Sequence, residues 1–495
     1  MPGVVISTAV RTGPSATTVR ESSQLFVVGL AERGPSNESV LVESLQDFEF
    51  KFGEYFASSY LHPTIETFFE EGGTQAYVAR VVGVGASAGT KVINGVLSAS
   101  ATTALTLDAV GEGTWSSGLT VTVEHVVANT SFRVKLYYNG TLLYNTGTVT
   151  TVAQAAGRIN TNVIASKYVL ATPATGATVP AVVTASAFSA GAAGSAVTAQ
   201  ERIDALDLFN DALGSGAVCI PDAENTVGNT TYTTSEALIA HANSYNRIAI
   251  LHSAESDDAT EVKAKVSSLQ AEDGAEHAAV YYPWVSVPTT VTGVSRLIPP
   301  DGYVAAKRAI AHNNTGPHAP AAGIQSAARF VIGTETEINK VTGDDLDENS
   351  VNAIRIIQNS VRIYGARSIS SDTENFRYIT TQDIINSVVV DAQRSLEELV
   401  FSSIDGRNTI YSNISSRLTA ICARLRDIGA LFEARTANGG LIDLGYTVRC
   451  DASLNPISQL AGGTVKAKIG LRTSTIGDKI EVEITKSNLT ASVVQ

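Results

Sequence analysis

The chain alternates between short apolar runs of strand length and amphipathic stretches of helical period. The apolar runs predict buried strands at residues 25–30, 76–82, 218–220, 247–251 and 278–282. One helical pattern runs through Leu41, Leu45 and Phe48. Another covers about residues 61–71 and ends at a pair of glycines, as expected between a helix and a strand. Strands that alternate with helices in this way predict a mostly parallel sheet covered by helices.

Between residues 83 and 200 the pattern changes from helical period to strict alternation. This stretch is rich in Ala, Thr, Val, Ser and Gly, and residues 119–123 and 134–138 alternate as strands do. The pair Asn139-Gly140 is a strong hairpin signal. We therefore expect an inserted, β-rich and peripheral domain. Its last part, about residues 171–199, is nearly low in complexity and also suits a flexible linker.

After Tyr378 a long helical region covers about residues 381–434, with a break near Asp405-Gly406. Two amphipathic helices fit this pattern better than one. Near the end of the chain, residues 465–472 alternate between apolar and basic positions and residues 480–484 between apolar and acidic ones. Opposite charges on paired strands favour pairing, so the two runs predict a half-buried hairpin.

The two ends of the chain are short β-prone segments that have no core of their own. Their apolar residues are Val4, Val5 and Ile6 at the start and Leu489, Val493 and Val494 at the end. An extended arm can satisfy its backbone hydrogen bonds on the sheet edge of another chain. We therefore expect both arms to add strands to neighbouring subunits.

These patterns predict a multidomain protein of the α/β and α+β classes. Its expected parts are an N-terminal arm (1–20), an α/β core (21–82 and 201–375), an inserted β-rich outer domain (83–200), a C-terminal helix-plus-hairpin domain (376–486) and a C-terminal arm (487–495). A chain of 495 residues is long enough for several such domains.

The charge, the cysteines and the absence of long apolar stretches bear on the protein's partners and surroundings. The formal net charge is -13, and no cluster of Lys and Arg provides a basic footprint, so we expect neither nucleic acid nor an anionic membrane as partner. Cys219, Cys422 and Cys450 lie far apart without metal-site spacing and predict buried thiols. No stretch has the pattern of a leader or of a membrane span, which predicts a protein made and kept in the cytoplasm.

Three features suggest chemistry at first sight. Ser87 lies in a Gly-x-Ser-x-Gly pattern after a strand, but the run that follows it is strand-like, so the helix of a hydrolase nucleophile elbow is missing. The nearest histidines, His312 and His318, lack metal spacing and predict hydrogen-bonded or solvated loop residues. The acidic run 344–348 lacks the order of a calcium loop and predicts a solvated turn. We therefore expect no catalytic residue, cofactor or metal.

Several segments, in order, resemble those of the contractile bacteriophage tail sheath family. They are Pro2-Gly3-Val4, Phe68-Phe69-Glu70-Glu71-Gly72-Gly73, Tyr77-Val78-Ala79-Arg80-Val81, Ala278-Ala279-Val280-Tyr281-Tyr282-Pro283-Trp284, Pro299-Pro300-Asp301-Gly302, Pro317-His318-Ala319-Pro320-Ala321, Val351-Asn352-Ala353-Ile354-Arg355, Ile363-Tyr364-Gly365-Ala366-Arg367-Ser368 and Asn455-Pro456. The chain departs from the family's pattern at Asp301, where serine is common. The resemblance covers about residues 1–82 and 201–495 and leaves out the insertion.

This resemblance implies a core with a subtilisin-like α/β fold that lacks the protease's machinery. No triad motif surrounds His241, His252 or Ser368. It also implies that subunits stack as hexameric rings in a helical homo-oligomer around a tail tube protein, with baseplate and tail terminator proteins as further partners. Such a sheath contracts and drives the tube through the host envelope for genome delivery; it belongs to the virion and is assembled in the bacterial cytoplasm. The alternatives are the sheath of a non-phage contractile injection system and a serine hydrolase using Ser87 or an unrecognised triad.

Two sets of arginines take on a possible role in this setting. Arg417, Arg424, Arg426 and Arg435 lie on or beside the last predicted helix. They form either a face that grips the inner tube or an ordinary solvated helix face, and the sequence supports both equally. Arg80 and Arg367 follow apolar strand positions, which suggests buried ion-pair residues.

Overall fold

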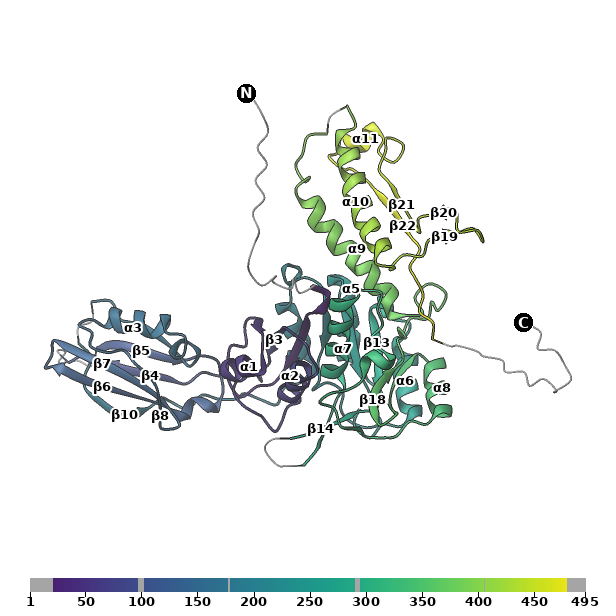
Figure 1. Ribbon diagram of the computed structural model, residues 1–495. Helices are drawn as coiled ribbons and strands as arrows, with labels where there is room; N and C mark the ends of the chain where they lie inside the picture. The colour runs from purple at the N-terminus through teal and green to yellow at the C-terminus, as the bar shows by residue number, and fades with distance from the viewer. Residues whose placement is uncertain (1–20, 97–101, 177–178, 290–293, 405, 479–495) are drawn as a thin grey trace, which may run out of the picture.

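The computed structural model describes residues 21–96, 102–176, 179–289, 294–404 and 406–478 (Figure 1). At its centre lies an eight-stranded sheet in the order β18-β17-β13-β12-β11-β1-β3-β2. The strands are β1 (Leu25–Gly29), β2 (Val40–Val42), β3 (Ala76–Arg80), β11 (Ala217–Cys219), β12 (Ile248–His252), β13 (Ala278–Tyr282), β17 (Val351–Ile357) and β18 (Ser360–Tyr364). The inner strands are parallel and the edge strands β2 and β18 antiparallel. The predicted mostly parallel sheet is confirmed.

Helices cover both faces of this sheet. The elements are α1 (Leu45–Phe52), α2 (Leu61–Glu70) and α7 (Asp301–Asn314) on one face, and α5 (Thr233–Tyr245), α6 (Ala259–Leu269) and α8 (Lys340–Glu348) on the other, with α4 (Ala199–Asp204) and the small sheet β14 (Val285–Val287), β15 (Arg296–Ile298) and β16 (Gly333–Thr334) beside them. Strand β1 contributes Leu25 and Val27 to one core and Phe26 and Val28 to the other. Because both faces are buried, the inner strands are continuously apolar.

The helical pattern predicted through Leu41 is wrong in its first part. Leu41 lies on β2, which pairs with β3, and α1 begins only after Ser44. The Ser44 side chain accepts a hydrogen bond from the Asp47 backbone N–H and caps the helix. Two valines flank Leu41, and β-branched residues favour a strand there.

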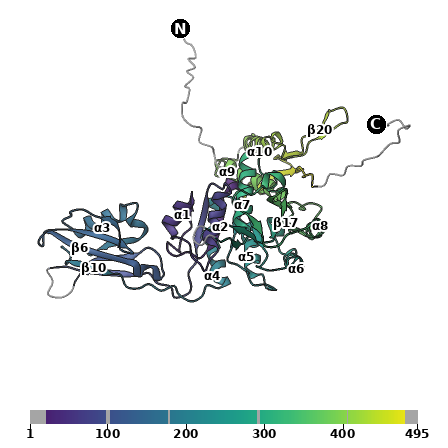
Figure 2. The same cartoon turned by 60° about the horizontal axis from the view of Figure 1, so that its bottom comes forward.

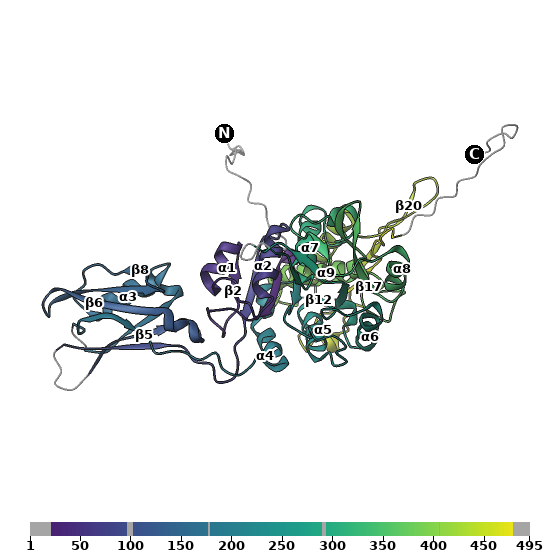
Figure 3. The same cartoon turned by 90° about the horizontal axis from the view of Figure 1, so that it is seen from below.

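The inserted part forms two small sheets and a helix, which lie beyond the β2 edge of the core sheet in Figures 1 and 3. The sheets have the orders β4-β5-β9 and β10-β6-β7-β8. Their elements are β4 (Thr90–Asn94), β5 (Thr103–Ala109), β6 (Leu119–Val127), β7 (Ser131–Tyr138), β8 (Thr141–Asn145), α3 (Val152–Thr161), β9 (Val169–Pro173) and β10 (Val183–Ala187). They enclose their own apolar core.

The hairpin predicted at Asn139-Gly140 is confirmed. Tyr138 pairs with Thr141, and the two turn residues have φ of 48° and 81°, the positive values that such a turn needs. The nearly low-complexity stretch contains β10, which pairs with β6, so that segment is part of the folded sheet.

Arg80 joins the insertion to the core. Its guanidinium donates to the carbonyl oxygens of Ala31 and Gly34 in the core and of Glu112 in the insertion, at 2.8–3.1 Å. The Glu112 carboxylate lies 3.6 Å away. Burial lowers the pKa of Arg80 to about 10. The prediction that Arg80 is a buried ion-pair residue is confirmed.

The C-terminal part contains the two predicted helices, α9 (Ile379–Glu397) and α10 (Thr409–Asp427). Short elements follow them: β19 (Ala434–Arg435), β20 (Leu441–Asp443), β21 (Tyr446–Arg449), α11 (Ile457–Leu460) and β22 (Lys468–Leu471). Figure 2 shows the β19–β20 hairpin projecting beyond α10. The alternating run before residue 472 forms β22, but it pairs with β21, a partner that the pattern did not indicate. Residues 480–484, its predicted partner, lie outside the described residues.

The acidic run 344–348 is helical, so the predicted turn is wrong, but Asp344, Asp345 and Glu348 are exposed to solvent as predicted. Asn339 caps the start of α8 through the Thr342 backbone N–H. Asp345 pairs with Lys263 at 2.7 Å, and Asp347 pairs with Arg367. The run therefore anchors α8 to its neighbours, and Arg367, with its side chain 5% exposed, is the buried ion-pair residue that was predicted. Within the described ranges no helix has the length and apolarity of a membrane span.

The expectation of loop histidines fails for His312, which is fully buried in α7. His241 is also buried in a helix, where its Nε2 lies 2.8 Å from Nη1 of Arg247. Burial, and then the charge of Arg247, lowers the pKa of His241 to about 3. The folded protein therefore keeps this imidazole neutral.

Acid should destabilise the protein through His241. A histidine of the unfolded chain has a pKa near its model value of 6.5, so between about pH 6.5 and about pH 3 the unfolded state binds the extra proton and stability falls as pH falls. We expect His241→Gln, whose amide oxygen can still accept from Arg247, to lose less stability than the wild type between pH 7 and pH 5. Urea unfolding at both pH values measures this. Equal losses in both proteins would contradict it.

Candidate functional site

The carboxyl ends of the parallel strands form the edge at which open α/β sheets bind ligands. Here that edge is filled by the chain's own polar groups. Asp222, which follows β11, accepts hydrogen bonds from the Ser59 hydroxyl at 2.8 Å, the Tyr60 N–H at 2.6 Å and the Leu30 N–H at 3.3 Å. Burial nevertheless raises the pKa of Asp222 above its usual range. This carboxylate therefore fastens α2 and β1 to β11.

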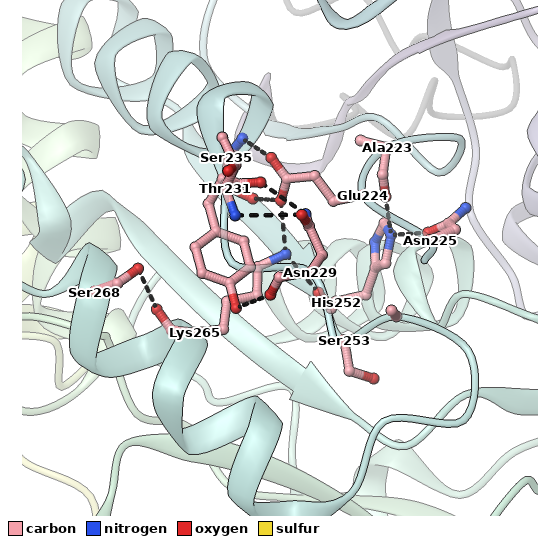
Figure 4. A network of polar contacts seen from close by, with 12 residues as sticks. Ala223, Glu224, Asn225, Asn229, Thr231, Ser235, His252, Ser253, Lys265 and Ser268 are labelled. Carbon is pink, nitrogen blue, oxygen red and sulfur yellow. Dashed lines mark hydrogen bonds and ion pairs between the residues drawn. The ribbon is translucent and has the colours of Figure 1, made fainter. Parts of the chain in front are cut away.

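A second part of the same edge is the network in Figure 4. Glu224 and Lys265 form an ion pair at 2.9 Å, with side chains 7% and 4% exposed. Glu224 also accepts from the backbone N–H and the hydroxyl of Ser235, and Lys265 donates to the carbonyl oxygen of His252. Burial favours protonation of Glu224, but the charge of Lys265 and these hydrogen bonds lower its pKa overall. The pair ties α5 and α6 to the end of β12.

His252 and Asp301 resemble part of a catalytic triad but lack its nucleophile. Nδ1 of His252 lies 2.9 Å from the Asp301 carboxylate, and Nε2 faces Asn225 Oδ1 at 2.9 Å and the Ala223 carbonyl at 3.1 Å. Both ring nitrogens are therefore engaged by oxygen acceptors, and neither is placed to take a proton from a serine. The Ser253 hydroxyl is buried and has no partner among the described residues.

The other residues considered for a hydrolase contact different parts of the molecule. Ser368 donates to the carbonyl of Phe376, and His241 faces Arg247. Ser87 lies where the chain enters the insertion, and its hydroxyl accepts from the Ala192 N–H at 3.2 Å. Strand β4 follows it, as the sequence predicted, and no helix of a nucleophile elbow begins there.

The four arginines that the sequence suggested for contact with a tube each pair with a carboxylate of their own chain. Arg417 and Arg424 reach across to Glu398 and Asp391 beside and on α9. Arg426 and Arg435 share Glu433, at 3.4 and 2.7 Å. These contacts offset much of the positive charge that the sequence suggested for this face. The side chains of Arg424 and Arg435 remain more than half exposed, at 59% and 57%.

The sheets differ in whether their edges are open. Lys51 Nζ caps β2 by donating to the Leu41 carbonyl at 2.7 Å, and Ala328 and Ser326 cover β18 through hydrogen bonds to residues 361 and 363. The outer edges of β21 and β22 have no backbone partner in the described part of the chain. Unpaired strand edges are sites for strand addition. The weak alternation of residues 446–449 did not reveal this ribbon from the sequence. The predicted arm residues lie outside the described residues.

Comparisons with known proteins rest on structure, because no family model and no curated protein matches this sequence. A sheath tail protein from Listeria innocua is 15% identical, with a TM-score of 0.57 over 88% of this chain and 90% of that one. A sheath tail protein from Desulfitobacterium hafniense is 14% identical, with a TM-score of 0.53 over 90% and 93%. The helical sheath of the anti-feeding prophage in its contracted state is 14% identical, with a TM-score of 0.54 over 98% and 99%. The chain therefore has the fold of the sheath proteins of contractile tails.

Proposed function

We propose that this protein is the sheath subunit of a contractile tail, a structural protein that polymerises around an inner tube and shortens to drive the tube through a cell envelope. The observation that carries the proposal is the match of 98% of the chain to a subunit of a helical sheath. Rigid subunits linked by extended arms can slide past each other and form more interface, so contraction needs no catalytic step.

Strand addition is the proposed means of linkage. The β21–β22 ribbon offers open edges, whereas both edges of the core sheet are capped. The first and last segments of the chain, with Val4, Val5, Ile6, Leu489, Val493 and Val494, would supply the added strands to neighbouring copies. Capped core edges would direct this pairing to the ribbon, because an added strand needs free N–H and C=O groups.

The remaining expectations complete the proposal. Copies would form hexameric rings stacked as a helix around a tail tube protein, with baseplate and terminator proteins at the ends. Arg424 and Arg435, the more exposed of the four arginines, would contact the tube. The subtilisin-like topology of the core and the domain limits stay predictions, as do assembly in the bacterial cytoplasm and a place in the virion.

Electron microscopy of the purified protein tests the proposal directly. We expect hollow tubes to form spontaneously as the concentration rises, because the interface gained on assembly favours the polymer. Averaged end views should have six-fold symmetry. A protein that stays monomeric at every concentration and salt condition would contradict the sheath function. Rings of another symmetry would contradict only the hexameric arrangement.

A non-phage contractile injection system is the second candidate, because 98% of the chain also matches the sheath of an extracellular contractile injection system, at 15% identity and a TM-score of 0.50. This match supports both candidates alike. The two candidates differ in what the tube delivers. Particles purified from the producing cells through an affinity tag on this chain separate them. Heads filled with DNA attached to the sheaths would support the phage tail, and headless particles would support the injection system.

A further inference from the structure

Arg308 lies where three parts of the chain meet. It belongs to α7, the buried helix of the core, and is itself 7% exposed. Its Nη1 donates to the carbonyl oxygen of Ser22, and its Nη2 donates to the carboxylate of Asp383. Ser22 belongs to the short 3-10 helix Glu21–Ser23, directly after residues 1–20. Asp383 lies near the start of α9, the first helix of the C-terminal part.

The Asp383 carboxylate is held as an anion inside the protein. Its side chain is 3% exposed, and Nε2 of His312 lies 3.4 Å from its second oxygen. Burial alone would raise the pKa of Asp383, but the charges of Arg308 and His312 lower it. Hydrogen bonds between two charged groups are about twice as strong as neutral ones. The hydrogen bond between Arg308 and Asp383 therefore stabilises the contact between α7 and α9.

The two segments that Arg308 joins differ in their other hydrogen bonds to the core. α9 has further bonds to the core, from Gln382 to His277 at 2.9 Å and from Asn386 to the Arg247 carbonyl at 3.4 Å. Within the described residues, the Ser22 carbonyl accepts only from Arg308, and Nε of Arg308 has no partner. In the part of the chain that the structure describes, this guanidinium therefore donates only to Ser22, directly after the N-terminal segment, and to Asp383, near the start of α9.

We propose that Arg308 is a positioning residue that couples the N-terminal arm to the C-terminal domain. The inference rests on the proposed sheath function, in which residues 1–20 bind a neighbouring subunit. A force on that arm is transmitted to β1 through the covalent chain. The same force is transmitted to α9 through the hydrogen bonds of Arg308 with Ser22 and Asp383. α9 belongs to the domain that carries the β21–β22 ribbon. The strand that a subunit donates and the ribbon on which it accepts one would then shift together.

Hydrogen–deuterium exchange on the full-length monomer tests this coupling. Arg308→Lys keeps a charge for Asp383, but one ammonium cannot also hold the Ser22 carbonyl in the fork of a guanidinium. We expect the amides of residues 22–24 to exchange about tenfold faster, as the loss of one charge-assisted hydrogen bond predicts, and those of residues 384–390 to stay unchanged. Arg355→Lys, on β17, is the matched control and should change neither segment.

Asp383→Asn distinguishes coupling from a local effect, because within the described residues no hydrogen bond or ion pair joins Asp383 to Ser22. Removing its charge should release Arg308 and speed exchange at residues 22–24 as well. Unchanged exchange there, in a variant whose circular dichroism is that of the wild type, would overturn the proposal. So would unchanged exchange in Arg308→Lys. These readouts are made on the monomer, whereas the sheath function is judged by tube formation, so the failure of one is distinguishable from the failure of the other.

Discussion

Replacing Val4, Val5 and Ile6 by aspartate should abolish tube formation and leave a folded, monomeric protein. These residues are the β-prone part of the N-terminal segment, and three charges oppose their addition to the sheet of a neighbour. The described residues form cores of their own, so the fold should persist. Electron microscopy and sedimentation measure polymer and monomer.

A matched control places the same charges elsewhere in the segment. Aspartate at Ser15, Ala16 and Thr17 adds the same net charge outside the β-prone run and should leave tubes intact. Deletion of residues 1–20 should reproduce the loss. Normal tubes from the Val4, Val5 and Ile6 variant would refute strand addition by this arm, and loss of tubes in both substituted proteins would assign the effect to charge alone.

Glu71→Gln should lower the free energy of unfolding of the core by about 3–5 kcal/mol, because it removes one partner of a buried ion pair. Glu71 and Lys307 lie 2.6 Å apart with side chains 0% and 3% exposed. The same carboxylate accepts from the backbone N–H groups of Arg329, Phe330 and Val331. The substitution would leave the Lys307 ammonium buried without a counterion.

Urea unfolding in a Trp115→Phe background measures this effect, since Trp284 then reports the core alone; Trp115 belongs to the core of the insertion. Asp344→Asn is the control. Its pair with Lys340 spans a similar distance, 2.8 Å, but the side chains are 60% and 81% exposed, so the loss should stay below about 0.5 kcal/mol. A loss of similar size in both variants would contradict the role of burial.

The elements with strong periodicity were predictable from the sequence. Five inner strands of the core sheet, β1, β3, β11, β12 and β13, follow from their apolar runs, because both of their faces are buried. The helices α9 and α10 follow from their hydrophobic period. The sixth inner strand, β17, was not among the predicted strands. The hairpin at Asn139 follows from the turn chemistry of a single pair of residues. The placement of Leu41 failed because a three-residue edge strand is too short for its period to show.

The polar contacts were not predictable, because they join residues far apart in the chain. Glu71 meets Lys307, and Arg308 meets Ser22 and Asp383, only after the sheet has brought α2, α7 and α9 together. The ion pairs of the acidic run in α8 were likewise not predictable, because its partners Lys263 and Arg367 lie elsewhere in the sequence. Sequence spacing therefore identified Arg80 and Arg367 as residues that need partners, but it could not name those partners.

The entry and exit of the inserted part meet at one point beside β3. The Ser195 N–H donates to the Val84 carbonyl at 3.0 Å, and a side chain at Gly83 would collide with the Ser195 carbonyl oxygen, 1.8 Å from its first atom. The core therefore sees the inserted part, more than a hundred residues long, as a connection whose two ends are in contact. The entropic cost of bringing these ends together depends only weakly on the length of the chain between them. Lineages could lengthen, shorten or replace the outer module while the strand order of the core stays the same.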